Sequence, residues 1–114
     1  MLSRLLQARP ADHHQDLTST LVVHAGFFIS YNDSYLRPNV TDAVREMMTV
    51  HRGDPIYVVG HSMGAAVATL CALDLQLTFD LGPSDVRLYT YGSPRVGNQA
   101  FAEFVARKLP VSLG

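Results

Sequence analysis

The sequence predicts an α/β protein with three layers, in which helices flank a small parallel sheet. Two apolar runs rich in β-branched and aromatic residues, Ile56–Val59 and Val86–Tyr91, are typical of strands. The Ala- and Leu-rich stretch Gly64–Phe79 between them is long enough to form a helix. A strand, a helix and a second strand in this order predict two parallel strands joined by a right-handed crossover.

The first twenty residues, Met1–Thr20, carry little pattern, and one interpretation is that they are disordered, so we take residues 21–114 as the domain. Met1–Arg9 is compatible with a short amphipathic helix ended by Pro10. Its two arginines weakly resemble the start of an organelle-targeting peptide, but no apolar core of a signal peptide follows. The compartment therefore stays open, with the cytoplasm as the default.

A short strand is expected at Leu21–His24, and a helix over Val40–Val50, where apolar residues recur at helical spacing after Pro38. Met47 and Met48 of that helix are expected to fill the core. Between the two elements lies an aromatic cluster without basic residues, which favours core packing over base stacking. Its members are Phe27, Phe28, Ile29, Tyr31 and Tyr35.

Residues Gly60-His61-Ser62-Met63-Gly64 join the Ile56–Val59 strand to its helix with the pattern G-x-S-x-G. Such a five-residue turn presents a serine hydroxyl at its apex, which predicts Ser62 as a nucleophile. Gly60 and Gly64 are expected to be required because strand and helix approach closely there. The Met63 amide, at a helix N-terminus, is the predicted oxyanion donor. His61 is expected to point away from the hydroxyl and to play a structural part.

The rest of the chain supplies a break, a loop and a final helix. Gly82-Pro83-Ser84 ends the Ala-rich helix, and Gly92–Gly97 follows the Val86–Tyr91 strand as a loop. Asn98 is a suitable N-cap for a helix that runs to about Leu109. Arg52-Gly53-Asp54 is interpreted as a turn and not as a ligand for a cell-surface receptor.

Composition excludes several classes of function. The 114 residues, 47% hydrophobic and 17% charged, are typical of one globular domain. A net charge of −1 argues against nucleic-acid binding, and no apolar run is long enough to cross a membrane. Cys71, the single cysteine, is expected to be a buried hydrophobic residue. The adjacent His13 and His14 have no further spaced ligands, so we predict neither a metal site nor a cofactor.

Three segments, Val23–Phe27, Val59–Ala65 and Tyr89–Asn98, occur in the order found in class 3 lipases, the fungal-type triacylglycerol lipases, and the chain resembles that family over about Leu21–Val105. The resemblance implies an α/β-hydrolase fold, of which the chain looks like an incomplete copy. It also implies a serine esterase acting on acylglycerols or related lipids. Ser62 would be its nucleophile, with the Met63 amide in the oxyanion hole.

The triad acid and the triad histidine are not expected within this chain. In α/β-hydrolases the order is Ser, then acid, then His, whereas all five histidines here precede Ser62. We therefore expect the chain by itself to hydrolyse esters barely, if at all. One alternative is a short, non-catalytic form that binds lipid or a partner. Another is a complete esterase in which His24 is the base. Open sheet edges are expected to favour self-association.

Overall fold

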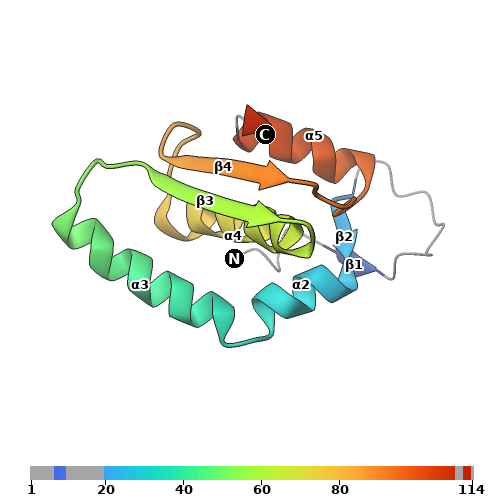
Figure 1. Ribbon diagram of the computed structural model, residues 1–114, viewed down its shortest axis with the longest axis horizontal. Coiled ribbons are helices and arrows are strands. Elements are labelled where there is room, and N and C mark those ends of the chain that lie inside the picture. Colours follow the sequence, from blue (N-terminus) through green and yellow to red (C-terminus); the bar gives the residue numbers. More distant parts are fainter. Residues whose placement is uncertain (1–6, 10–19, 110–111, 114) are drawn as a thin grey trace.

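The computed structural model describes residues 7–9, 20–109 and 112–113 (Figure 1). Their elements are, in order, β1 (Gln7–Arg9), β2 (Val22–His24), α2 (Ala25–Asn32), α3 (Leu36–Val50), β3 (Ile56–His61), α4 (Met63–Phe79), β4 (Val86–Tyr91), α5 (Gln99–Lys108) and β5 (Ser112–Leu113). The predicted α/β class and the parallel sheet with flanking helices are confirmed.

The main sheet has the strand order β3-β4-β5, and both pairings are parallel. β3 and β4 pair along their whole length, from Ile56 opposite Val86 to His61 opposite Tyr91. β2 does not join this sheet, because it pairs in parallel with β1 in a separate two-stranded sheet. The alternative with His24 as the base requires the Leu21–His24 strand to lie in the same sheet as β3 and β4, and this arrangement is not observed. Gln7–Arg9 form a strand and not part of the amphipathic helix considered above.

Helix α4 lies against β3 and β4 and is the centre of the core (Figure 1). Ala65, Ala66 and Ala68 are buried, and their small side chains let the first turns of the helix lie close to the sheet. The helix is buried along most of its length, including Cys71, as predicted. Burial raises the pKa of the Cys71 thiol to about 11, so this thiol is neutral at physiological pH.

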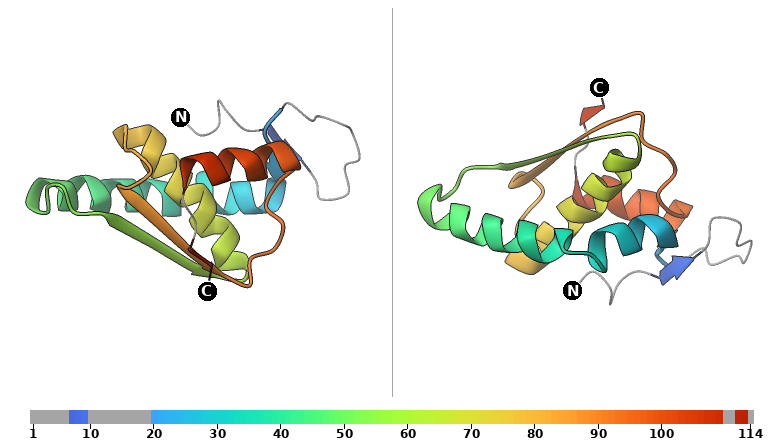
Figure 2. Two further views of the ribbon diagram at one scale, coloured as in Figure 1. Left: turned by 90° about the horizontal axis from the view of Figure 1, so that it is seen from above. Right: turned by 60° about the horizontal axis from the view of Figure 1, so that its bottom comes forward.

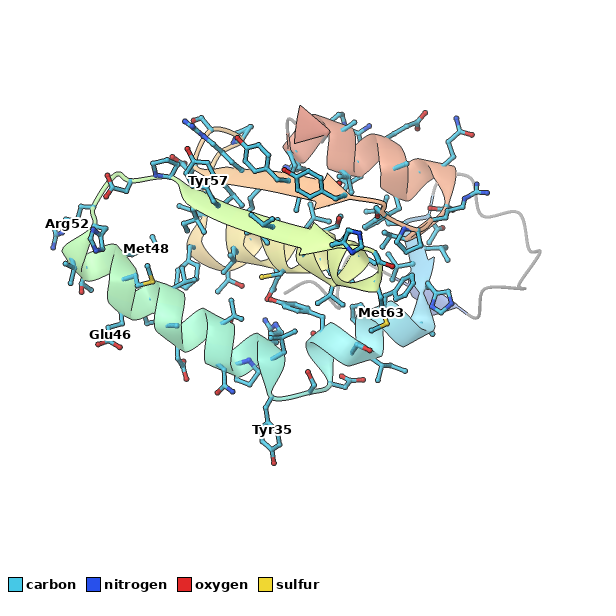
Figure 3. The ribbon with its side chains drawn as sticks, viewed as in Figure 1. Tyr35, Glu46, Met48, Arg52, Tyr57 and Met63 are labelled. Atoms are coloured by element: carbon cyan, nitrogen blue, oxygen red, sulfur yellow. The ribbon has the colours of Figure 1, made fainter. Side chains whose placement is uncertain are left out.

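The segment between β2 and β3 differs most from the prediction. Its first part forms the unpredicted helix α2, and α3 begins four residues before Val40 because Pro38 is tolerated in a first turn. Phe28 and Tyr31 are buried as expected, but Ile29 and Tyr35 are exposed, and Tyr35 points away from the protein (Figure 3).

Helix α3 has no fully buried residue. Met47 is 58% exposed, so its assignment to the core is wrong, and Met48 is only partly buried. Val40 and Val44 pack against the edge of the core. The apolar stripe of this helix is therefore wide enough to lie on the core surface but does not enter it.

A buried carboxylate joins the three helices α2, α3 and α4. Asp74 of α4 is fully buried and accepts a hydrogen bond from the Tyr31 hydroxyl at 2.6 Å. The Arg37 guanidinium donates to the same carboxylate, with Nε at 2.8 Å, and Thr78 Oγ1 lies at 3.3 Å from it. Burial and the bond to Asp74 raise the pKa of the Tyr31 phenol well above its ordinary value, so the phenol stays protonated and donates.

The two faces of the main sheet differ in what covers them. Helices α4 and α5 lie on one side of β3 and β4 (Figure 2). On the other side the Tyr57 and Val59 side chains are 55% and 62% exposed, and Tyr57 stacks on Tyr89 with 5.9 Å between ring centroids. Within the described residues this aromatic face is open to solvent, so they form two of the three predicted layers, the sheet and the helices on one side of it.

Candidate active site

Ser62 occupies the single residue between β3 and α4, so the turn is tighter than the five residues predicted. Its backbone angles are φ 55° and ψ −124°, a strained conformation for a residue with a side chain. The neighbouring elements hold it there, because the Ser62 amide donates to the Tyr91 carbonyl at 2.9 Å and the Ser62 carbonyl accepts from the Ala65 amide at 2.9 Å. This geometry is that expected of a serine presented at the end of a sheet.

Gly60 is required by the close approach of the strand to the helix. A Cβ atom on Gly60 would lie 2.3 Å from the Gly64 carbonyl oxygen and 2.8 Å from the Ala65 Cα. Both contacts are with backbone, which cannot rotate away. These two contacts support the predicted requirement for glycine at this position.

Packing does not require glycine at position 64, so the prediction for Gly64 is wrong. A Cβ atom on Gly64 would find no atom of its surroundings within 4 Å, and its φ is not positive. Only a side chain on Gly60 would clash, because the Gly64 backbone occupies the space where a Gly60 Cβ would lie. The motif alone does not reveal this asymmetry.

Met63 is the first residue of the 17-residue helix α4, and its side chain is 60% exposed. Figure 3 shows Met63 beside α2, at the end of the sheet where α4 begins. The amide of a first helical residue has no carbonyl four residues earlier within the helix to bond. The positive end of the α4 dipole adds to its attraction for a negatively charged oxygen.

None of the histidines in the described part of the chain hydrogen-bonds the Ser62 hydroxyl. The His24 ring caps α2, where Nδ1 accepts from the Gly26 amide at 3.0 Å, and it packs against Phe27 with 4.5 Å between centroids. His51 lies 3.5 Å from the Asp54 carboxylate in the exposed turn after α3. His61 is exposed at the end of β3. His13 and His14 fall outside the described residues.

The loop after β4 brings the other two motif segments together. The His24 amide donates to the Val96 carbonyl at 2.7 Å, and the Asn98 amide donates to the Val22 carbonyl at 2.9 Å. Asn98 also caps α5, as predicted, by accepting from the Phe101 amide at 2.9 Å. Since the Ser62 amide bonds Tyr91, which immediately precedes this loop, all three segments of the predicted family pattern are connected by backbone hydrogen bonds.

Two classes of site are not seen in the described residues. No group of three or more His, Cys, Asp or Glu side chains there is placed to hold a metal ion. No helix among them has the length and apolar character needed to cross a membrane.

Comparison with known proteins matches the whole described region to one family. The model of the family described as Lipase (class 3) matches residues 2–113. A lipase of Rhizomucor miehei is 42% identical over 84 residues, which are 73% of this chain and 23% of that protein. A secreted mono- and diacylglycerol lipase of Malassezia globosa is 39% identical over 90 residues, covering 79% of this chain and 28% of the relative.

Solved structures of lipases resemble this chain in fold. The crystal structure of a lipase from Rhizopus microsporus var. chinensis superposes with a TM-score of 0.74 at 34% identity, covering 94% of this chain and 37% of that structure. The chain spans about a quarter of the length of the curated relatives it matches. One of those relatives is named as secreted, so it gives no support to the cytoplasm as a default.

Proposed function

This chain belongs to the class 3 lipases, and we propose that it presents Ser62 as the nucleophile of a serine hydrolase of lipid esters, acylglycerols or related lipids. The observation that supports the proposal most is the strained backbone of Ser62 in the one-residue turn between β3 and α4. A non-glycine residue held at positive φ costs of order 1–3 kcal/mol, and such strain is retained mainly where it serves function.

The proposed reaction is acyl transfer in two steps. The Ser62 oxygen bonds to the ester carbonyl carbon, and the negative charge that develops on the carbonyl oxygen accepts a hydrogen bond from the Met63 amide. The alcohol leaves with the proton that the serine lost, and water then releases the carboxylic acid from the acyl-serine. Removal of the serine proton needs a base, and no described side chain forms a hydrogen bond with the hydroxyl.

We therefore expect slow chemistry from the 114-residue polypeptide. Loss of the triad in serine proteases lowers turnover by about 10⁶-fold, leaving only the contribution of the oxyanion hole and of binding. Imidazole added in solution can act in place of a missing histidine, because it is a base of suitable pKa. It should raise the part of the reactivity that depends on Ser62.

The test is prolonged exposure of the chain to a fluorophosphonate probe, with and without imidazole, followed by mass spectrometry of the peptides. Ser62 should carry the adduct, Ser62→Ala should carry none there, and imidazole should increase the yield. Ser93→Ala is the matched control, because Ser93 is an exposed loop serine whose hydroxyl donates a hydrogen bond to the neighbouring Pro94 carbonyl. Equal labelling of the Ser62→Ala chain would refute the assignment.

A second candidate function is a non-catalytic module that binds lipid or a partner protein. The open aromatic face of β3 and β4 favours it, as does the lack of a described base beside Ser62. The free edge of β3 would also support self-association of the chain, because its backbone groups on that side have no strand partner among the described residues. The secreted relative favours a compartment outside the cytoplasm.

A further inference from the structure

A cavity of about 400 Å³ lies between β4, α4 and α5, beside the loop that follows β4. We call it the α5 cavity. Its floor consists of buried side chains from all three elements, including Leu88, Thr69 and Phe101. No residue of the Ser62 turn lines it. Its volume falls within the range of about 300–1,000 Å³ that small-molecule sites occupy.

The rim of the α5 cavity is polar and positively charged. Arg95 and Gln99 line it and are exposed to solvent. In the region for which side chains are described, the ion pairs involve Arg37, Arg45 and His51, so Arg95 has no carboxylate partner there. Helix α5 begins at the same rim, and its N-terminal dipole adds positive potential of the same sign.

We propose that the α5 cavity binds an aliphatic carboxylate with a single chain, the chain lying on Leu88 and Phe101 and the carboxylate at Arg95. An apolar floor below a cationic rim matches such an amphiphile at both ends. The volume admits one alkyl chain and not the several chains of a triacylglycerol. A monocarboxylate is also what ester hydrolysis at Ser62 would release, but the binding site does not depend on that activity.

The test is calorimetric titration of the folded 114-residue chain with dodecanoate below its micelle concentration, beside dodecanol and acetate. We expect one site per chain, at least threefold weaker binding of dodecanol, and none of acetate. Arg95→Gln should weaken dodecanoate binding by about two- to fivefold, the loss expected for a solvent-exposed ion pair. Arg107→Gln is the matched control, because Arg107 is an exposed cation at the other end of α5 and does not line the cavity.

A second variant tests the location. Ala102 lines the cavity from an exposed position on α5, so Ala102→Phe can fill the space without disturbing the core and should abolish binding. Ser62→Ala should bind dodecanoate like the native chain, which separates this site from the proposed catalytic one. Dodecanoate bearing a diazirine should label peptides of β4 and α5 in the native chain, a readout that needs no variant to fold.

Four results would overturn the proposal. These are absence of binding by the native chain, undiminished binding by folded Ala102→Phe, equal affinity for dodecanol, and photolabelling confined to the Met63 end of α4.

Discussion

Replacement of Gly60 by alanine tests whether the contact between strand and helix at the Ser62 turn has the geometry described. The added Cβ would lie 2.3 Å from the Gly64 carbonyl oxygen, and real Cβ contacts are essentially never below 3.0 Å. The first turn of α4 must therefore move by at least the difference between these distances, and α4 is the most buried helix of the described region. Overpacking of this kind costs about 1–3 kcal/mol.

For a domain of this size, each kcal/mol shifts the melting temperature by about 4–8 °C. Gly60→Ala should thus lower the midpoint of thermal unfolding, followed by circular dichroism at 222 nm, by roughly 5–20 °C. It should also reduce fluorophosphonate labelling of Ser62, because the Ser62 turn moves with the helix. Gly64→Ala is the matched control, since its Cβ meets nothing within 4 Å and alanine is the better helix former. If Gly60→Ala and Gly64→Ala lowered the melting temperature equally, the conclusion that only a Gly60 side chain clashes would be refuted.

Three further variants probe the strain at Ser62 and the buried groups. Ser62→Gly should stabilise the chain by about 1 kcal/mol because glycine adopts positive φ without cost, whereas Ser62→Ala should not; equal melting temperatures would contradict the strain. Arg37→Met leaves the buried Asp74 carboxylate with only its hydroxyl donors. It should lower the free energy of unfolding, measured by urea denaturation, by about 1–3 kcal/mol. A loss below about 0.5 kcal/mol would show that the ion pair is unimportant for stability. The raised pKa of Cys71 means that the folded chain keeps a proton that the unfolded chain loses above its ordinary value of 9.0, so this stabilising contribution is complete below pH 9 and disappears towards pH 11. Between pH 9 and pH 11 the free energy of unfolding should therefore fall less steeply with pH in Cys71→Ala than in the native chain. Identical slopes for the two proteins would contradict the raised pKa of Cys71.

The regular elements of the main sheet could be predicted because their patterns are local. β4 has the predicted bounds, since Val86–Tyr91 alternates between buried and exposed residues, and the Asn98 cap lies where a capping side chain precedes an apolar helix. Helix α2 could not be predicted in this way. Its apolar residues show almost no helical periodicity, and its cap is His24, which is not among the usual capping residues.

The site was predictable in its chemistry and less so in its contacts. The spacing of the motif indicates a turn around Ser62, but the different situations of Gly60 and Gly64 depend on which backbone lies in front of which Cβ. The roles of Asp74 and Arg37 were also missed. They are 37 residues apart in sequence, and a lone acid on an apolar helix gives no signal of its partner.

The way in which α3 is attached has a consequence for the order in which the native protein opens. Helix α3 has no fully buried side chain, and its ion pair with the buried Asp74 is made by Arg37 in its first turn. Helix α4, in contrast, is buried along most of its length. Regions with few buried contacts unfold locally at low free energy, and enclosed elements open only with the whole domain. Amide hydrogens from about Val44 to Val50 should therefore exchange with solvent deuterium through partial opening, well before those of Leu70–Leu75. Among the described helices, the C-terminal half of α3 would be the first to be cut by a protease acting on the folded chain.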